Sequence, residues 1–191
     1  IISENSGVTL QATVGVNNGT AIHNEGNVTA KDQILLTSYK GDVTNYGRMT
    51  STNGSVSLTA AGVYETEDNN NFTIVNNITN TGSITAAQEV LLRTVNGSID
   101  NRNQITSQNS TVTIKAEQHS TYNGNEAVGN IRNGVGASYD TKADITALQG
   151  IILEAAGNIH NIGDYFVKGV GDIVVNAAKE IANVGNYTVE N

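Results

Sequence analysis

The chain has 191 residues, with 10 basic and 18 acidic side chains, a formal net charge of −8, no cysteine and no proline. The lack of cysteine excludes disulfides and cysteine-bound metal. The negative charge disfavours nucleic acid and anionic lipid as partners. No apolar run approaches the length of a membrane-spanning helix, so we expect no membrane insertion.

A short unit of a β-branched residue, a polar residue and asparagine returns along the whole chain. Its asparagines are Asn24, Asn45, Asn80, Asn101, Asn133, Asn161 and Asn183. Subtracting their numbers gives steps of 21, 35, 21, 32, 28 and 22 residues. A base period near 21 or 22 with three longer steps is typical of a solenoid that carries loop insertions.

Two further sets of apolar segments recur in step with this unit. Alternating five-residue segments begin at Val8, Ile34, Val56, Val90, Val112, Ile151 and Ile173. Three-residue segments begin at Val28, Met49, Ile84 and Ile105. Alternation with period two predicts strands, and strands this short bury their side chains by stacking coil on coil.

We therefore predict an all-β chain that folds as a parallel β-helix with about 21–22 residues and three short strands per coil. A single period runs from end to end, which predicts one domain over residues 1–191. The lack of proline agrees with this fold, because nearly every strand of a β-helix is central and needs its backbone N–H.

The seven asparagines are interpreted as a structural ladder. Asparagine tolerates the backbone conformations of turns. Identical amides stacked in successive coils can also hydrogen-bond to one another. These properties account for the repeat without any chemistry at the site.

Three insertions interrupt the period, at residues 61–73, 117–130 and 134–142. Insertions in a solenoid map to loops, often on a binding face. Possible partner contacts in them are Tyr64, Phe72, His119, Tyr122 and Tyr139. Tolerated surface loops are the alternative. The first two insertions should leave the coil at the same point, so we expect them to project from one side.

No catalytic, metal or cofactor site is predicted. The acidic residues are spread along the chain, and Glu65, Glu67 and Asp68 lie in one Asn-rich loop without a matching cluster. His23 and His160 occupy the same place in the repeat, but five coils at about 4.8 Å separate them by roughly 24 Å. They cannot share an ion.

The units Ile22-x-Asn24-x-Gly26-x-Val28-x-Ala30 and Ile78-x-Asn80-x-Gly82-x-Ile84-x-Ala86 resemble the haemagglutinin repeats of filamentous haemagglutinin. The wider family is the large exoproteins of bacterial two-partner secretion, which includes adhesins and contact-dependent growth-inhibition toxins. The resemblance covers about residues 6 to 189. It implies a right-handed β-helix, export through an outer-membrane transporter, and display as a fibre at the bacterial surface.

From this resemblance we expect a secreted structural and adhesive segment of a longer fibre, which contacts a receptor or glycan on a host or bacterial cell through its insertions. One alternative is the stalk or receptor-binding part of a contact-dependent growth-inhibition toxin. A more distant alternative is a carbohydrate-active β-helix enzyme, which would need clustered carboxylates.

Overall fold

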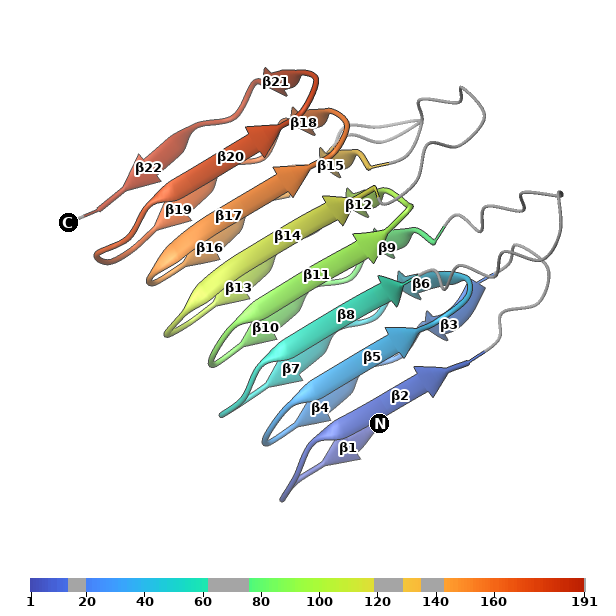
Figure 1. Cartoon of the computed structure of the whole chain (residues 1–191). Helices are drawn as coiled ribbons and strands as arrows, with labels where there is room; N and C mark the ends of the chain where they lie inside the picture. The colour runs from blue at the N-terminus through green and yellow to red at the C-terminus, as the bar shows by residue number, and fades with distance from the viewer. Residues whose placement is uncertain (14–19, 62–75, 119–128, 135–142, 191) are drawn as a thin grey trace, which may run out of the picture.

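The chain is a right-handed parallel β-helix, as the sequence predicts (Figure 1). The computed structural model describes residues 1–13, 20–61, 76–118, 129–134 and 143–190. Within these ranges all regular structure is strand, and no helix occurs. The strands form three parallel sheets, which we name sheets A, B and C in the order in which the chain visits them.

Sheet A consists, in spatial order, of β1 (Ile2–Ser3), β4 (Val28–Ala30), β7 (Met49–Ser51), β10 (Ile84–Ala86), β13 (Ile105–Ser107), β16 (Ile145–Ala147), β19 (Tyr165–Val167) and β22 (Tyr187–Val189). Sheet B consists of β2 (Val8–Ala12), β5 (Ile34–Ser38), β8 (Val56–Ala61), β11 (Val90–Val95), β14 (Thr111–Glu117), β17 (Gly150–Ala155) and β20 (Ile173–Ala177). Sheet C consists of β3 (Thr20–Asn24), β6 (Asp42–Asn45), β9 (Ile78–Asn80), β12 (Ile99–Asn101), β15 (Ile131–Asn133), β18 (Ile159–Asn161) and β21 (Ile181–Asn183).

Each coil takes one strand from each sheet, so coil 1 is β1–β3 and coil 7 is β19–β21, with β22 beginning the next turn (Figure 1). Equivalent residues of successive coils pair in register. Val56, Val90 and Val112, for example, stand one above another in sheet B. Backbone bonds join the coils, as in Val56 N to Glu89 O at 3.0 Å and Ile151 N to Asp172 O at 3.0 Å.

The core is the narrow interior between the three sheets. It is filled by the inward half of each alternating segment, and most of these side chains, such as Ile34, Leu58, Ile99 and Ile151, are completely buried. The outward half carries mostly Thr, Ser and charged residues, with apolar side chains at some sheet B positions such as Leu35 and Leu91. The alternation in the sequence therefore becomes the division between core and surface.

The two ends of the stack are open. At the C-terminal end, side chains at positions that are buried in other coils are uncovered. Ile181 is 48% exposed, Tyr187 44% and Val189 43%. At the other end Ile1 and Ile2 are 61% and 75% exposed. Each coil therefore depends on its neighbours to cover its apolar side chains.

Candidate functional site

The seven asparagines of the repeat lie in one column at the end of the sheet C strands. Each amide Nδ2 donates to the Oδ1 of the asparagine in the next coil, from Asn24 through to Asn183, at 2.6–2.8 Å. The column has one direction, because every bond points toward the C-terminal end. The five central asparagines are 0–1% exposed, so the bonds satisfy polar groups that would otherwise be costly to bury.

In the last four coils of the column the same amides also close the turn that follows the sheet C strand. Asn101 Nδ2 donates to Asn103 O at 2.8 Å, and Asn161 Nδ2 donates to Gly163 O at 2.7 Å. Both hydrogens of these amides are therefore engaged inside the protein. A side chain fully used in this way holds the backbone, and it has no remaining donor for a ligand.

A second polar column lies where the chain enters sheet C, and sequence reasoning missed it. Asp42 Oδ1 accepts from Asn77 N at 2.7 Å, and Asn77 Oδ1 accepts from Ser98 N at 2.9 Å. The column continues as Ser98 Oγ accepts from Asn130 N at 3.2 Å and Asn130 Oδ1 accepts from Asn158 N at 2.8 Å. Burial raises the pKa of Asp42, and the hydrogen bond from Asn77 opposes this effect. The signal available in the sequence was a small polar residue (Asp, Asn or Ser) directly before the β-branched residue in five of the seven units.

The residues proposed to contact a partner, Tyr64, Phe72, His119, Tyr122 and Tyr139, lie outside the described residues. Their points of departure are described. Ala61 and Glu117, the first residues of two predicted insertions, are instead the last residues of β8 and β14, and both are in register with Val95. They therefore stand two coils apart, about 10 Å, on one line along the corner between sheets B and C. We call this line the B–C corner.

The third insertion leaves from a different corner. Asn133 Nδ2 donates to Ala143 O at 2.7 Å. In the next coil Asn161 Nδ2 makes the equivalent bond to Gly163 O, which is only two residues later in the chain. Residues 134–142 therefore replace a single turn residue between sheet C and sheet A. Its point of departure is separated from those of the other two insertions by the width of sheet C.

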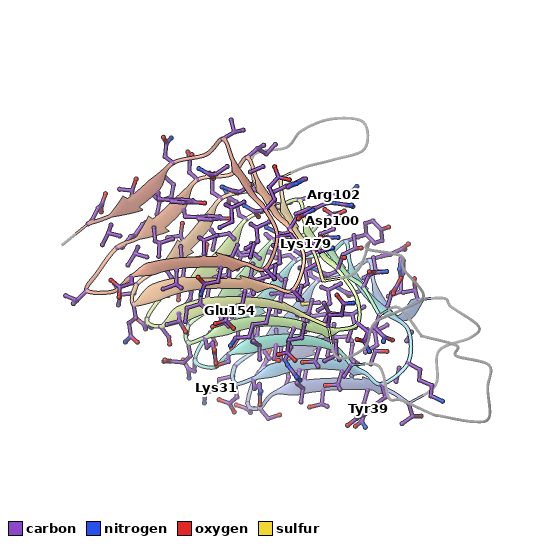
Figure 2. All side chains as sticks on the ribbon, turned by 45° about the horizontal axis from the view of Figure 1, so that its top comes forward. Lys31, Tyr39, Asp100, Arg102, Glu154 and Lys179 are labelled. Carbon is purple, nitrogen blue, oxygen red and sulfur yellow. The ribbon has the colours of Figure 1, made fainter. Side chains whose placement is uncertain are left out.

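Tyr39 is an exposed aromatic residue at the B–C corner. It directly follows Ser38, which pairs with Ala60, and its backbone N donates to Ala12 O at 3.0 Å. Its side chain is 38% exposed and lies on the same side as the corner (Figure 2). An exposed tyrosine on a rigid turn is a typical anchor for a binding partner.

A second exposed group lies on sheet C and the turn that follows it. The rings of His23 and Tyr46 contact each other with centroids 5.2 Å apart, and His23 Nε2 lies 3.0 Å from Glu25 Oε1. Farther along, Asp100 Oδ2 accepts from Arg102 Nε and Nη2 at 3.1 and 2.5 Å (Figure 2). This bond raises the pKa of Arg102. The side chains of His23 and Glu25 are 45% and 80% exposed, and such surface pairs add little to stability. Asp100 is only 18% exposed, and its Oδ1 is buried without a hydrogen-bond partner among the described residues.

Tyr165 is the one aromatic residue of the described core. Its ring stacks on Tyr187 with centroids 5.0 Å apart, and its hydroxyl is buried without a hydrogen-bond partner among the described residues. Burial raises the pKa of Tyr165 well above its ordinary value. A neutral phenol enclosed by apolar side chains is suited to packing.

The described residues contain no group of three or more His, Cys, Asp or Glu side chains placed to hold a metal ion. His23 and His160 lie in coils 1 and 6 of sheet C, separated by four intervening strands. In the same part of the chain there is no helix long and apolar enough to cross a membrane.

Comparison with known proteins adds no relative. No family model, curated protein or solved structure matches the chain. What the chain does must therefore be argued from its own geometry.

Proposed function

We propose that this chain is a structural and adhesive segment of a secreted bacterial surface exoprotein, which contacts a receptor or glycan on a host or bacterial cell through its insertions. The observation that carries the proposal is the placement of the insertions. The coils keep strict register on both sides of each insertion, as Ala60, Thr94, Ala116 and Ala155 do in sheet B. The repeat therefore serves as a rigid support from which variable loops leave at fixed points.

The stacking supports the proposal of a fibre, because each coil inside the molecule pairs with the strand edges of its neighbours and covers their apolar side chains. Export through an outer-membrane transporter and display at the bacterial surface follow from the resemblance of the repeats, and belong to the same proposal.

The two insertions of the B–C corner can be deleted without changing the register of the coils. Coil 6 passes from Ala155 to Ile159 through three residues, and Ile159 is in register with Ile131. Deleting residues 62–75 joins Ala61 to Asn76 and leaves three residues between Ala60 and Ile78. Deleting residues 118–128 joins Glu117 to Gly129 and likewise leaves three between Ala116 and Ile131. Both deletions recreate the turn of coil 6.

The test compares binding of the intact chain and the double-deletion variant to cells and to a glycan array. We expect unchanged far-ultraviolet circular dichroism, a nearly unchanged Tm and loss of binding. A variant lacking residues 135–142 alone serves as a matched control, because that loop leaves from the other corner and carries Tyr139. Binding that survives both sets of deletions would assign adhesion to the repeated coils and overturn the proposal.

A further inference from the structure

The outward face of sheet B carries a ridged apolar stripe that differs from the other two faces. Its central row, read along the solenoid axis, is Thr9, Leu35, Ser57, Leu91, Thr113, Ile152 and Val174, all in register. From coil 1 to coil 6 small and large side chains alternate. The equivalent row of sheet A is mostly threonine, as in Thr50, Thr85 and Thr106.

The alternation makes a surface of knobs and depressions. Leu35, Leu91 and Ile152 are partly exposed, whereas Ser57 and Thr113 between them are only 8% and 7% exposed. Coils are about 4.8 Å apart, so knobs recur every 9.6 Å or so. The gap between two knobs therefore has about the width of one aliphatic side chain. The Thr113 hydroxyl donates to Glu89 Oε1 at 3.3 Å, so it already has a partner within the chain.

We propose that this face binds a second copy of the chain, with the two solenoids side by side and antiparallel. In an antiparallel pair whose two-fold axis passes between coils 3 and 4, Leu91 of one copy enters the depression at Ser57 of the other. Leu35 then faces Thr113, and Ile152 faces Thr9. A parallel pair related by a two-fold axis would set each leucine on its own counterpart and hold the sheets apart, so among two-fold symmetric dimers the alternation selects the antiparallel arrangement.

Charges beside the stripe select the register. The neighbouring outward row carries Arg93 and Lys115, which are paired with Glu117 and Glu154 at 2.7 Å in each case. With the axis between coils 3 and 4, Arg93 faces Thr59 and Lys115 faces Thr37 of the other copy. Moving the axis by one coil toward the C-terminal end also places knobs in depressions, but it sets Arg93 against Lys115, and like charges at an interface are costly. Moving it by one coil toward the N-terminal end pairs only coils 1 to 4, so it covers less of the stripe.

The size of the face indicates the strength of the contact. Six coils at about 4.8 Å and five residues at about 3.3 Å give a rectangle of roughly 29 by 17 Å. Two such faces bury about 1,000 Å², which is at the lower limit for a specific interface. We therefore expect a weak, concentration-dependent dimer. The inference is independent of the proposed adhesive function, because it uses none of the insertions.

Sedimentation velocity of the full chain at concentrations up to about 1 mM tests the proposal. Leu91→Glu removes the central knob, and Ser57→Leu fills the central depression. Each is expected to weaken the dimer at least about tenfold, while the circular dichroism spectrum stays unchanged because both side chains point outward. The matched controls are Thr85→Glu and Thr85→Leu on sheet A, which should leave the dimer intact.

A cross-linking experiment tests the orientation without depending on these variants. The chain has no cysteine, so Thr59→Cys and Arg93→Cys introduce single reactive sites. A short bis-maleimide should join the two variants to each other in a mixture more efficiently than it joins Thr59→Cys to itself. A chain that stays monomeric throughout, a dimer insensitive to Leu91→Glu, or preferred linkage of position 59 to itself would each overturn the proposal.

Discussion

Coils 6 and 7 carry the same sheet B pattern and differ in what covers it. In coil 6, Ile151 and Leu153 are fully buried, and in coil 7 their register partners Ile173 and Val175 are partly exposed. The residue types are nearly identical. The comparison teaches that the sequence of a coil decides which side chains point inward, whereas the next coil decides whether they are buried. Stability in this molecule is therefore a property of pairs of coils.

The largest effect that separates the two coils should come from a buried charge. Ile151→Asp places a carboxylate without a partner in the apolar interior, and we expect a loss of at least about 4 kcal/mol in the free energy of unfolding. Ile173→Asp, at the equivalent position of coil 7, keeps contact with water and should cost less than about half as much. Denaturant unfolding of the two variants measures the difference. Equal losses would mean that the end of the stack is covered in solution.

The asparagine column allows the same comparison for polar groups. Asn101 accepts from Asn80 and donates to Asn133 in the middle of the column, at 2.7 Å in both cases. Asn101→Ala leaves a buried donor and a buried acceptor without partners, at about 1–3 kcal/mol for each. Asn183 lies at the exposed end, where water can replace a lost partner.

We therefore expect Asn101→Ala to lower the free energy of unfolding by about 2–6 kcal/mol, and Asn183→Ala by less than about 1 kcal/mol. Thermal and denaturant unfolding of the two variants provide the test. A similar loss at both positions would show that the column contributes through the individual turn and not through the bonds between coils.

The turn glycines give a third matched pair. A Cβ built on Gly82 would overlap the carbonyl oxygen of Gly47 in the preceding coil, whereas a Cβ on Gly26 meets nothing within 4 Å. Gly82→Ala must push two backbones apart, at about 1–3 kcal/mol or more. Gly26→Ala should change stability by no more than about 0.5 kcal/mol. Calorimetric Tm values decide between this expectation and a purely conformational role for glycine, which would predict similar changes at both positions.

Much of this architecture could be predicted from the sequence, because packing repeats in every coil. The alternation that starts at Val8, Ile34 and Val56 returns as β2, β5 and β8. Strands whose sequence lacks this alternation could not be predicted in the same way. Tyr165–Val167 has three large residues in succession, so no alternation marks β19, and the ring of Tyr165 was not expected in a core of aliphatic side chains.

The polar column through Asp42 and Asn158 was missed for a different reason. Its side chains accept from a backbone N–H of the next coil, and Asp, Asn and Ser can all perform that role. Physical equivalence thus hides the column from a search for identical residues. The aromatic residues of the insertions lie beyond what a repeat pattern can place, because each loop occurs once and no second copy fixes its conformation.

The smallest expected effect uses Asp42, the one carboxylate of that column. Burial, the largest contribution, raises the pKa of Asp42 above its ordinary value of 3.8. The folded protein therefore holds the proton more tightly than the unfolded chain does, so this group lowers the free energy of unfolding as pH rises from the unfolded pKa through the raised folded pKa. Below both values the effect vanishes.

Asp42→Asn should remove that loss, because an amide oxygen can still accept from the backbone N of Asn77, as Asn77 itself accepts from Ser98. The gain should appear at pH 7 and disappear below the ordinary pKa of an aspartate. It should stay under about 1 kcal/mol because the side chain is only half-buried. Ser98→Asn, a change to the same side chain at an uncharged position of the column, controls for the amide itself and should show no dependence on pH. Unfolding curves for both variants at pH 3 and pH 7 provide the measurement, and a gain that persists at pH 3 would mean that packing of the amide, and not removal of a charge, stabilises the column.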